Sequence, residues 1–333
     1  MITIFRNIKD AYKLVSHAAN VTPIMTSRTL DSNIGAQRVI VKCENFQRTG
    51  SFKFRGAWNS ISRIPKEEKR KGILAHSSGN FGQAVALVAT ILKLKATIVM
   101  PNNATPSKIQ ATRGYGAEVV LCGTNPRDRS RMAEKLIQEY DYRLVHPYDD
   151  YNVIFGAGTA AYELMTRIKA IDLLLVPIGG GGLISGSSIA AKGLDPRVKV
   201  IGIEPKNADD AFRSFQTGRR LPVANPDTIA DGLRTSVGEK TFPIIQEYVN
   251  DIVTVSEDQI IDAMKFYWER MKLIVEPSGA VSLAGLISGS IDPSLIKNKR
   301  IGIILSGGNI DLTDFFNTLR KGLTSDWKTK IKK

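Results

Sequence analysis

Cysteine is scarce in this sequence, with Cys43 and Cys122 the only two among 333 residues. Two cysteines make no disulfide framework and are too few for a structural zinc site. Long apolar runs are also missing, since none approaches the roughly 20 residues that a membrane-spanning helix needs. The first residues, MITIFRNIKDAYKL, carry spaced charges rather than a basic patch before an apolar core, so they predict no signal peptide. We therefore expect a soluble, cytoplasmic protein without a membrane partner.

Acidic residues are outnumbered, because 32 Asp and Glu stand against 46 Lys and Arg and leave a formal net charge of +14. A basic balance can indicate binding to nucleic acid or to an acidic membrane surface. Here the cations are dispersed, with local runs only at 66–71 and 328–333, and the first run mixes in two glutamates after a proline, as exposed helix starts do. This pattern argues against a nucleic-acid partner and favours anionic ligands such as phosphates and carboxylates.

Short apolar runs alternate with helical patterns through most of the chain. The runs that predict strands are 38–44, 72–77, 96–101, 117–123, 172–178, 199–205 and 300–306. The patterns that predict helices include 80–92, 128–140, 156–169 and 257–272. Continuous apolar strands separated by helices predict an α/β fold in which helices cover both faces of a parallel sheet. Ligands of such sheets bind at the carboxyl ends of the strands, where the glycine and serine clusters of this sequence fall.

A lysine between two phenylalanines stands out in the segment SFKFRG, residues 51–56. Apolar rings beside the ammonium of Lys53 would desolvate it, and desolvation lowers a lysine pKa toward the neutral amine that attacks an aldehyde. An exposed lysine on an amphipathic helix would explain the same residues. The hexapeptide alone leaves both interpretations open.

The segment SSGNFGQA, residues 77–84, lies between a predicted strand and a predicted helix. Small residues at a helix N-terminus leave backbone N–H groups free for an anion. The hydroxyls of Ser77 and Ser78 and the amide of Asn80 add donors, which suits a substrate carboxylate. Simple helix capping by serine or asparagine is the alternative, but it does not explain so many small and polar residues together.

Four consecutive glycines follow the strand 172–178 and precede another helical pattern. They are Gly179, Gly180, Gly181 and Gly182, with Leu183 next. Strand, glycines and helix form the geometry of a phosphate cradle. The dinucleotide motif G-x-G-x-x-G does not fit, because position 184 is isoleucine, and no Gly-Lys-Ser/Thr follows. The cluster therefore indicates a phosphorylated cofactor that needs neither nucleotide signature.

Two further clusters follow predicted strands. LSGGN, residues 305–309, ends the last strong strand, and EPKNADD, residues 204–210, follows the strand 199–205. The carboxylates of Glu204 and Asp210 could supply oxygen ligands to a hard cation. Capping of a helix that starts near Asp209 explains their spacing equally well.

In this order and spacing, the motifs resemble those of fold-type II pyridoxal-phosphate enzymes, and within them the serine/threonine dehydratase and serine racemase branch. The resemblance runs from Thr22 to Asn309 and includes CENFQRTGSFKFRGA, MPNNATPSKIQATRGYGAEV, HPYDD, TIADGL and EPSGA. It implies a two-domain fold like that of the tryptophan synthase β-subunit, with parallel-rich twisted sheets flanked by helices. A large cofactor-binding domain would comprise 1–66 and 150–322, with a small domain, 67–149, inserted in it and a basic tail at 323–333.

The resemblance also assigns roles to residues. Lys53 would bind pyridoxal 5′-phosphate (PLP) as a Schiff base beside Phe52, Asn80 would bond the ring hydroxyl, and Ser306 would face the pyridine nitrogen. The phosphate would lie on the backbone N–H groups of Gly179, Gly180, Gly181, Gly182 and Leu183. The substrate carboxylate would bind Ser77, Ser78 and Asn80, and Ser78 resembles the residue that serves the opposite face in racemases. Glu204, the carbonyl of Ala208 and Asp210 match a site for Mg²⁺ or Ca²⁺.

A neutral hydroxyl at the ring nitrogen makes the cofactor a weaker electron sink than an aspartate would, which favours loss of a β-leaving group over transamination. The amine of Lys53 is the natural base for the α-proton. The resemblance thus predicts an L-serine/L-threonine dehydratase that yields a 2-oxo acid and ammonia, in a homodimer. The alternatives are a serine racemase, alone or bifunctional, a threo-3-hydroxyaspartate ammonia-lyase, and a non-catalytic amino-acid-binding protein on the same fold.

Two positions depart from the family pattern. Phe81 stands where the family usually has histidine, so the carboxylate loop loses a polar group. Tyr148 stands where racemases tend to have asparagine and dehydratases an aromatic residue, which favours dehydration. Little chain follows Asn309, so we expect no further domain of the kind through which isoleucine inhibits the biosynthetic threonine dehydratases.

Overall fold

The computed structural model of the protein describes residues 2–77, 79–223, 226–313 and 315–317. The described α-helices are α1 (Ile2–Val15), α2 (Arg28–Ile34), α3 (Lys53–Arg63), α4 (Lys66–Arg70), α5 (Asn80–Ile91), α6 (Pro106–Gly114), α7 (Pro126–Tyr140), α8 (Tyr151–Arg167), α9 (Gly182–Leu194), α10 (Asp210–Thr217), α11 (Thr241–Tyr248), α12 (Glu257–Phe266) and α13 (Pro277–Ile287). The described strands are β1 (Ile24–Thr26), β2 (Arg38–Cys43), β3 (Ile73–His76), β4 (Ala96–Pro101), β5 (Glu118–Cys122), β6 (Arg143–Leu144), β7 (Leu173–Pro177), β8 (Lys199–Pro205), β9 (Asp251–Val255) and β10 (Arg300–Leu305).

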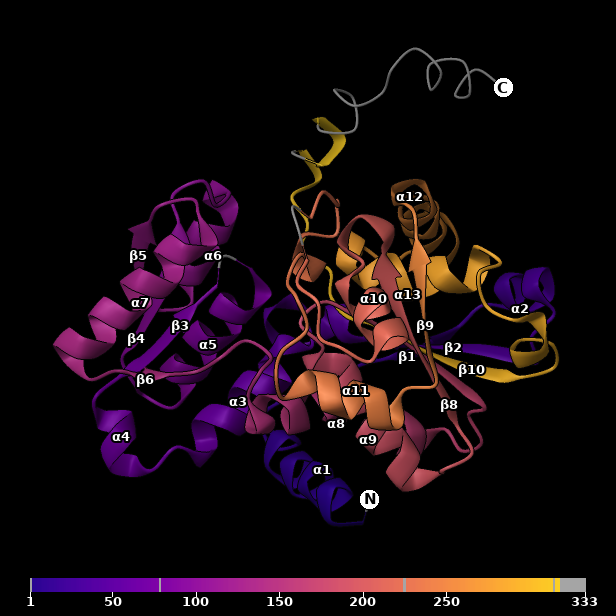
Figure 1. The fold of residues 1–333 in the computed structure, drawn as a ribbon, viewed down its shortest axis with the longest axis horizontal. Coiled ribbons are helices and arrows are strands. Elements are labelled where there is room, and N and C mark those ends of the chain that lie inside the picture. The colour runs from indigo at the N-terminus through magenta and orange to yellow at the C-terminus, as the bar shows by residue number, and fades with distance from the viewer. Residues whose placement is uncertain (1, 78, 224–225, 314, 318–333) are drawn as a thin grey trace.

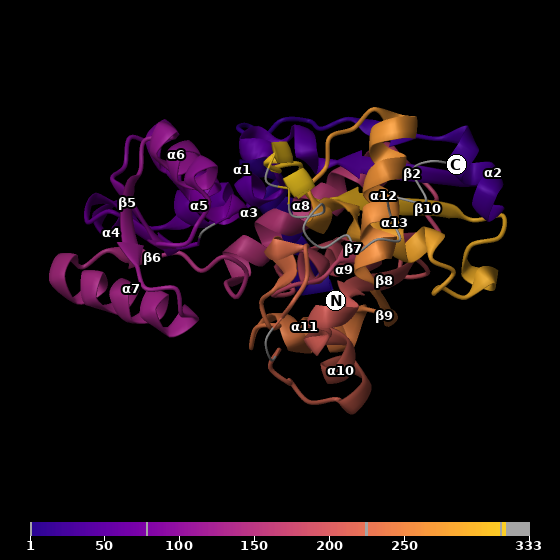
Figure 2. The ribbon, with the colours of Figure 1, turned by 90° about the horizontal axis from the view of Figure 1, so that it is seen from above.

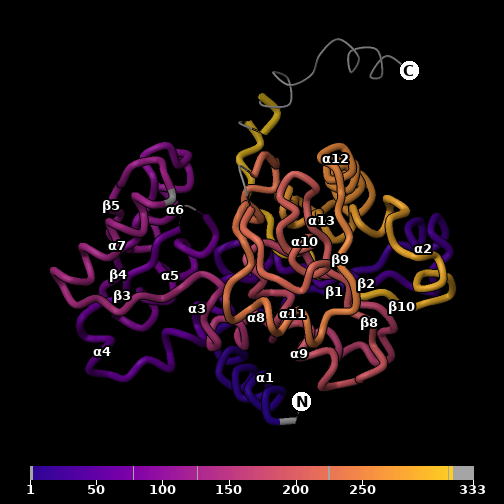
Figure 3. Tube along the Cα trace, in the orientation of Figure 1, coloured from indigo at the N-terminus to yellow at the C-terminus, as the bar shows by residue number. Residues whose placement is uncertain are grey.

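The strands form two sheets, which lie in separate lobes of the molecule (Figures 1 and 2). A six-stranded sheet has the order β1-β2-β10-β7-β8-β9, and a four-stranded sheet has the order β5-β4-β3-β6. All pairings are parallel except that of β1 with β2. Helix α3 lies between the lobes, as the chain trace in Figure 3 also shows. The predicted α/β class with parallel-rich sheets and flanking helices is confirmed.

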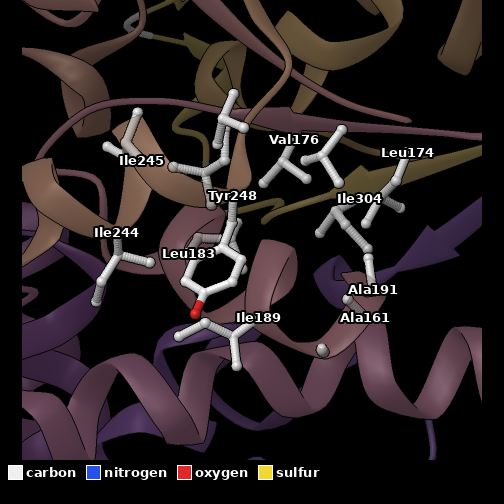
Figure 4. Close-up of a cluster of buried hydrophobic side chains, with 14 of the residues drawn as sticks. Ala161, Leu174, Val176, Leu183, Ile189, Ala191, Ile244, Ile245, Tyr248 and Ile304 are labelled. Carbon is white, nitrogen blue, oxygen red and sulfur yellow. The ribbon is translucent and has the colours of Figure 1, made fainter. Parts of the chain in front are cut away.

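The central strands of the large sheet are buried on both faces because helices cover each side. Leu174 and Val176 of β7 point to the face covered by α8, α9 and α11, where Tyr248 and Ile189 fill the core (Figure 4). Leu173 and Leu175 point to the opposite face, where residues of α12 and α13 cover them. This two-sided burial explains why the strand reads as a continuous apolar run rather than an alternating one.

Some elements differ from their sequence patterns. Strands β1, β6 and β9 lie at sheet edges and were not predicted. Strands β1 and β6 have only three and two residues, too few for a recognisable apolar run. The helical pattern 257–272 ends its regular part at Phe266, and a π-helical turn follows from Tyr267 to Met271. The four-stranded sheet draws its strands from 73–144, within the predicted small domain, but the domain boundaries themselves stay a prediction.

Both cysteines are free and buried, as the absence of a disulfide framework predicts. Within the described part of the chain, no helix is long and apolar enough to cross a membrane. The basic tail at 323–333 lies outside the described residues.

Candidate active site

A cavity of about 220 Å³ is lined by elements of both lobes, at the carboxyl ends of β3, β7 and β10. Most of the residues that the sequence singled out line this one cavity. They are Phe52, Lys53, Ser77, Asn80, Gly179, Gly180, Gly181, Gly182, Leu183 and Ser306. The predicted catalytic residue Ser78 lies outside the described residues. The predicted cation ligands Glu204, Ala208 and Asp210 do not line the cavity.

Lys53 is the first residue of α3, and its ammonium group lies against apolar rings. Its Nζ is 5.0 Å from the ring centroid of Phe52 and 5.7 Å from that of Phe81, and it donates to the carbonyl oxygen of Pro147 at 3.0 Å. Burial lowers the pKa of Lys53 to about 8, although the carboxyl of Glu276 acts in the opposite sense. About a tenth of an amine with that pKa is neutral at pH 7, far more than for a solvated lysine. The flanking phenylalanine and the unusual Phe81 both contribute to this desolvation.

The four glycines connect β7 to α9 and place a helix N-terminus at the cavity. Gly181 has φ +87°, a left-handed conformation that favours glycine, and no side chain caps α9. The N–H groups of a first helical turn have no intrahelical acceptor, so they are available to an anion in the cavity. Protein neighbours also require the glycines, since a Cβ at Gly180 would lie 2.4 Å from the ring of Tyr148. Close packing by an aromatic ring was not expected from the sequence.

The turn before α5 offers a second uncapped helix N-terminus. Gly79 is the N-cap residue, and among the described residues no side chain accepts an N–H of the first turn of α5. Ser77 and Asn80 therefore do not cap the first turn of α5, whereas Ser78 lies outside the described residues. Ser77 Oγ accepts from the backbone N–H of Gly79 at 3.3 Å. Asn80 instead donates to Glu276 Oε1 at 2.7 Å and accepts from Asn309 at 2.8 Å.

Ser306 directly follows β10 and is held against the segment that carries Lys53. The backbone N–H of Phe52 donates to the carbonyl oxygen of Ser306 at 3.0 Å, and Ser51 forms an antiparallel bridge with Gly307. The hydroxyl of Ser306 donates to the carbonyl oxygen of Ser278 at 3.3 Å. That distance is longer than the roughly 2.7–2.8 Å typical of a hydroxyl donor. The hydrogen bond from Ser306 to Ser278 is therefore weak.

Several cavity residues were missed as site residues by the sequence analysis. Glu276 precedes α13 and is buried, and burial, with a contribution from Asp231, raises its pKa to about 8. Its segment, EPSGA, was noted only as part of a resemblance. Arg129 comes from α7, where nothing distinguishes it from its neighbouring arginines. Lys108 of α6 also lines the cavity, where it forms an ion pair with Asp231 across the two lobes.

Two partly buried histidines complete this side of the cavity. The rings of His76 and His146 meet edge to face with centroids 5.9 Å apart. His146 Nδ1 accepts the backbone N–H of Asp149 at 2.8 Å, and burial lowers the pKa of His146 to about 4. His146 is therefore neutral at physiological pH and adds no charge to the cavity.

One predicted cation ligand, Glu204, caps the first turn of α10. The carboxylate of Glu204 accepts the backbone N–H groups of Ala211 and Phe212 at 3.1 and 2.9 Å, as the helix-capping alternative expected. Asp210 Oδ2 accepts the N–H of Val237, whereas its Oδ1 is buried without a partner among the described residues. Burial, together with Asp210, raises the pKa of Glu204. No group of three or more His, Cys, Asp or Glu side chains arranged for a metal occurs in the described ranges.

The cavity residues fit PLP on chemical grounds. They supply a desolvated amine for an aldehyde, an uncapped helix N-terminus after a glycine loop for a phosphate, and a neutral hydroxyl for a pyridine nitrogen. A nucleotide would need phosphate-binding signatures that the loop does not have.

Comparisons with known proteins agree with this fit. Residues 15–307 match the family described as "Pyridoxal-phosphate dependent enzyme". The chain is 44% identical to an L-threo-3-hydroxyaspartate ammonia-lyase of Pseudomonas sp, over 95% of this chain and 98% of that protein. It is 43% identical to a serine racemase of Dictyostelium discoideum, over 94% and 97%. The solved structure of threonine deaminase isoform 2 from Solanum lycopersicum superposes with a TM-score of 0.89 at 36% identity, over 95% of this chain and 92% of that one. The chain belongs to the pyridoxal-phosphate dependent enzymes of fold type II, the family that its motifs resemble.

Proposed function

We propose that this enzyme eliminates water from small 3-hydroxy amino acids, L-serine and L-threonine among them. Hydrolysis of the resulting free enamine, which takes up one water, then releases ammonia and a 2-oxo acid. The observation that carries the proposal is the position of Lys53, whose desolvated amine lines the same cavity as the glycine loop and Ser306. The ammonia-lyase and threonine deaminase among the similar proteins support the same reaction type.

Lys53 would hold PLP through the aldehyde of the cofactor. The amine of Lys53, once released, would take the α-proton of the substrate. When bound, PLP supplies an electron sink for the charge left on that carbon. The rings of Phe52 and Phe81 exclude water from the amine and keep a neutral fraction available as a base. The backbone N–H groups of Gly179 to Gly182 and of Leu183 would bind the phosphate.

Other residues would orient the reactants and bias the outcome. Asn80 would bond the ring hydroxyl, and the neutral hydroxyl of Ser306 would face the ring nitrogen without keeping it protonated. A weak sink favours prompt departure of the β-hydroxyl over transamination. Ser77 and the uncapped N-terminus of α5 would bind the substrate carboxylate, together with Ser78, which we propose for the opposite face of the substrate.

One observation favours a second candidate function, elimination from L-threo-3-hydroxyaspartate. Arg129 lines the cavity, and among the described residues no hydrogen bond or ion pair engages its guanidinium. Lys108, the other cation on this side, is already neutralised by Asp231. A free guanidinium is suited to a second substrate carboxylate, which serine and threonine lack.

The first experiment tests the cofactor site through the visible spectrum. Purified protein supplied with PLP should show a yellow absorbance band, and Lys53→Ala should abolish it. If the wild-type protein shows no such band, the whole proposal fails and a binding protein on the same fold becomes the better explanation.

The second experiment is a substrate panel with the holoenzyme. L-serine, L-threonine and L-threo-3-hydroxyaspartate are assayed for equal amounts of 2-oxo acid and ammonia, and L-serine also for D-serine. Predominant D-serine would replace elimination by racemisation as the main activity. Arg129→Gln should lower kcat/KM for hydroxyaspartate by roughly 10- to 100-fold, the value of a charge-assisted hydrogen bond. The exposed Arg131→Gln on the same helix should change it by less than about twofold.

We also propose a cation at Glu204, the carbonyl of Ala208 and Asp210. The support is that two buried carboxylates face each other and one oxygen of Asp210 has no partner among the described residues. A bound Mg²⁺ or Ca²⁺ would neutralise this pair. The melting temperature should then rise with either cation after chelation, and Asp210→Asn should remove the rise. The homodimer stays a prediction from the family resemblance, to be checked by light scattering.

A further inference from the structure

Glu276 is a buried carboxyl in the cavity that has no part in the scheme above. It is the N-cap residue of α13, but its side chain does not cap that helix. Instead its Oε1 accepts a hydrogen bond from Asn80 Nδ2 at 2.7 Å. The side chain is 4% exposed, so its position carries a desolvation cost that helix capping does not explain.

The surrounding backbone makes room for this carboxyl. A Cβ at Gly307 would lie 2.2 Å from Glu276 Oε1. The backbone N–H of Glu276 also donates to the carbonyl oxygen of Gly307 at 3.3 Å. The first glycine of the SGGN motif is therefore needed so that a carboxyl can reach the cavity next to Ser306.

The amide of Asn80 is fixed at both ends. Its Oδ1 accepts from Asn309 Nδ2 at 2.8 Å, and the same Asn309 group donates to the carbonyl oxygen of Thr49 at 2.6 Å. An asparagine amide has two N–H donors, of which Glu276 takes one. With the oxygen end assigned to Asn309, one N–H of Asn80 is left for a group in the cavity.

We propose that Glu276 is a positioning residue, which holds the Asn80 amide in the orientation that the ring hydroxyl of the cofactor requires. The inference rests on the proposed role of Asn80 in cofactor binding and is independent of which hydroxy amino acid is the substrate. Without an acceptor at Glu276, the contact of Asn80 Oδ1 with Asn309 alone would hold the amide, and its N–H groups would no longer be fixed toward the ring hydroxyl.

The protonation state of Glu276 is compatible with this role. The charged groups that act on it are Asp231, which favours the protonated form, and Lys108, which opposes it, while Lys53 lies close enough for Glu276 to stabilise its ammonium. Burial is the largest cause, and the pKa is raised to about 8. A protonated carboxyl still accepts through its carbonyl oxygen, as a glutamine amide does. Glu276→Gln is therefore the conservative variant, and Glu276→Ala removes the acceptor.

The experiment measures PLP binding to the apoenzyme by absorbance, together with the circular dichroism of the visible band, which reports cofactor orientation. Glu276→Ala and Asn80→Ala should each weaken binding roughly 5- to 100-fold, because a buried donor loses its partner or the contact is lost. The double variant should be within about threefold of the weaker single variant, since both changes break one interaction. Glu276→Gln should bind within about threefold of wild type and keep the dichroic band.

Matched variants separate positioning from general stability. Glu163→Gln alters another buried carboxyl, one that does not line the cavity, and should lower the melting temperature of the apoprotein without changing PLP binding. If Glu276→Ala does not fold, Glu276→Asp takes its place. The aspartate is one methylene shorter and moves the acceptor away from Asn80, so we expect the same loss of PLP binding. Wild-type binding in the alanine variant, or losses that multiply in the double variant, would overturn the inference. Absence of a visible band in wild type would refute the proposed function instead.

Discussion

Four charged side chains are buried together beneath the helix that carries Lys53. Arg55 of α3 donates to the carboxylate of Glu44 at 2.7 and 2.8 Å and to that of Glu163 on α8 at 3.1 Å. Lys42 of β2 forms an ion pair with Glu163. All four are 2% exposed or less, and two cations balance two anions. The cluster joins the first turn of α3 to the large sheet and to α8.

Removal of one member should be far more costly than removal of a neutral pair. Glu163→Leu leaves two buried cations, Lys42 and Arg55, to share the one carboxylate of Glu44, and breaking a buried pair in this way costs about 3–5 kcal/mol. Such a loss is a large share of the roughly 5–15 kcal/mol by which a protein is stable. Burial already lowers the pKa of Lys42, and without Glu163 that lysine would lose its proton more readily. Because a neutral lysine is less costly to bury than a charged one, this deprotonation limits the loss of unfolding free energy.

Urea unfolding of the apoprotein, followed by far-ultraviolet circular dichroism, measures this cost for Glu163→Leu, Lys42→Met and the double variant. The double variant should recover at least half of the sum of the two single losses, because it removes a cation together with an anion. A single variant that costs less than about 1 kcal/mol, or additive losses in the double variant, would refute the assignment of the cluster as an interdependent network.

Two other predictions concern the glycine loop and pH. Gly181→Ala should weaken PLP binding at least tenfold by titration, because Gly181 has φ +87° and the added Cβ would lie 2.7 Å from Thr241 Oγ1. Gly289→Ala, at φ +76° in open space, controls for backbone strain alone and should bind PLP normally. The pKa of Glu276 rises from its model-peptide range in the unfolded chain to about 8 in the folded one, so the folded protein binds the extra proton. The wild-type apoprotein should therefore lose stability relative to Glu276→Gln as pH rises from about 4.5 to 8, and equal slopes in urea titrations at several pH values would contradict this.

The cofactor side of the site could be predicted from the sequence because each part is local. The four glycines and Ser306 follow recognisable apolar strands, and parallel strands bring their carboxyl ends to one edge. Lys53 is marked by the phenylalanines on either side of it. The order of these contiguous motifs also carried the resemblance to the family. No contact between distant segments was needed for either inference.

The contacts around Asn80 and the substrate end could not be predicted in the same way. Glu276 and Asn309 reach Asn80 from 196 and 229 residues away in sequence, and a single sequence records no such pairing. Arg129 lies on a helix with an ordinary amphipathic pattern, so only the position of α7 relative to the cavity distinguishes it. The ring of Tyr148 over Gly180 is likewise a product of how the two lobes meet.

The cofactor-binding residues that the sequence predicts and the substrate-end cations that it does not predict belong to different sheets. Ser306 and the glycine loop are attached to the large sheet, whereas Arg129 and Lys108 belong to helices of the small one. Changes in α6 and α7 can therefore alter the charge offered to a substrate side chain while leaving the phosphate loop and the ring-nitrogen partner in place. Because Asp231 neutralises Lys108 across the lobes, Arg129 is the described cavity cation that we propose to select a second carboxylate.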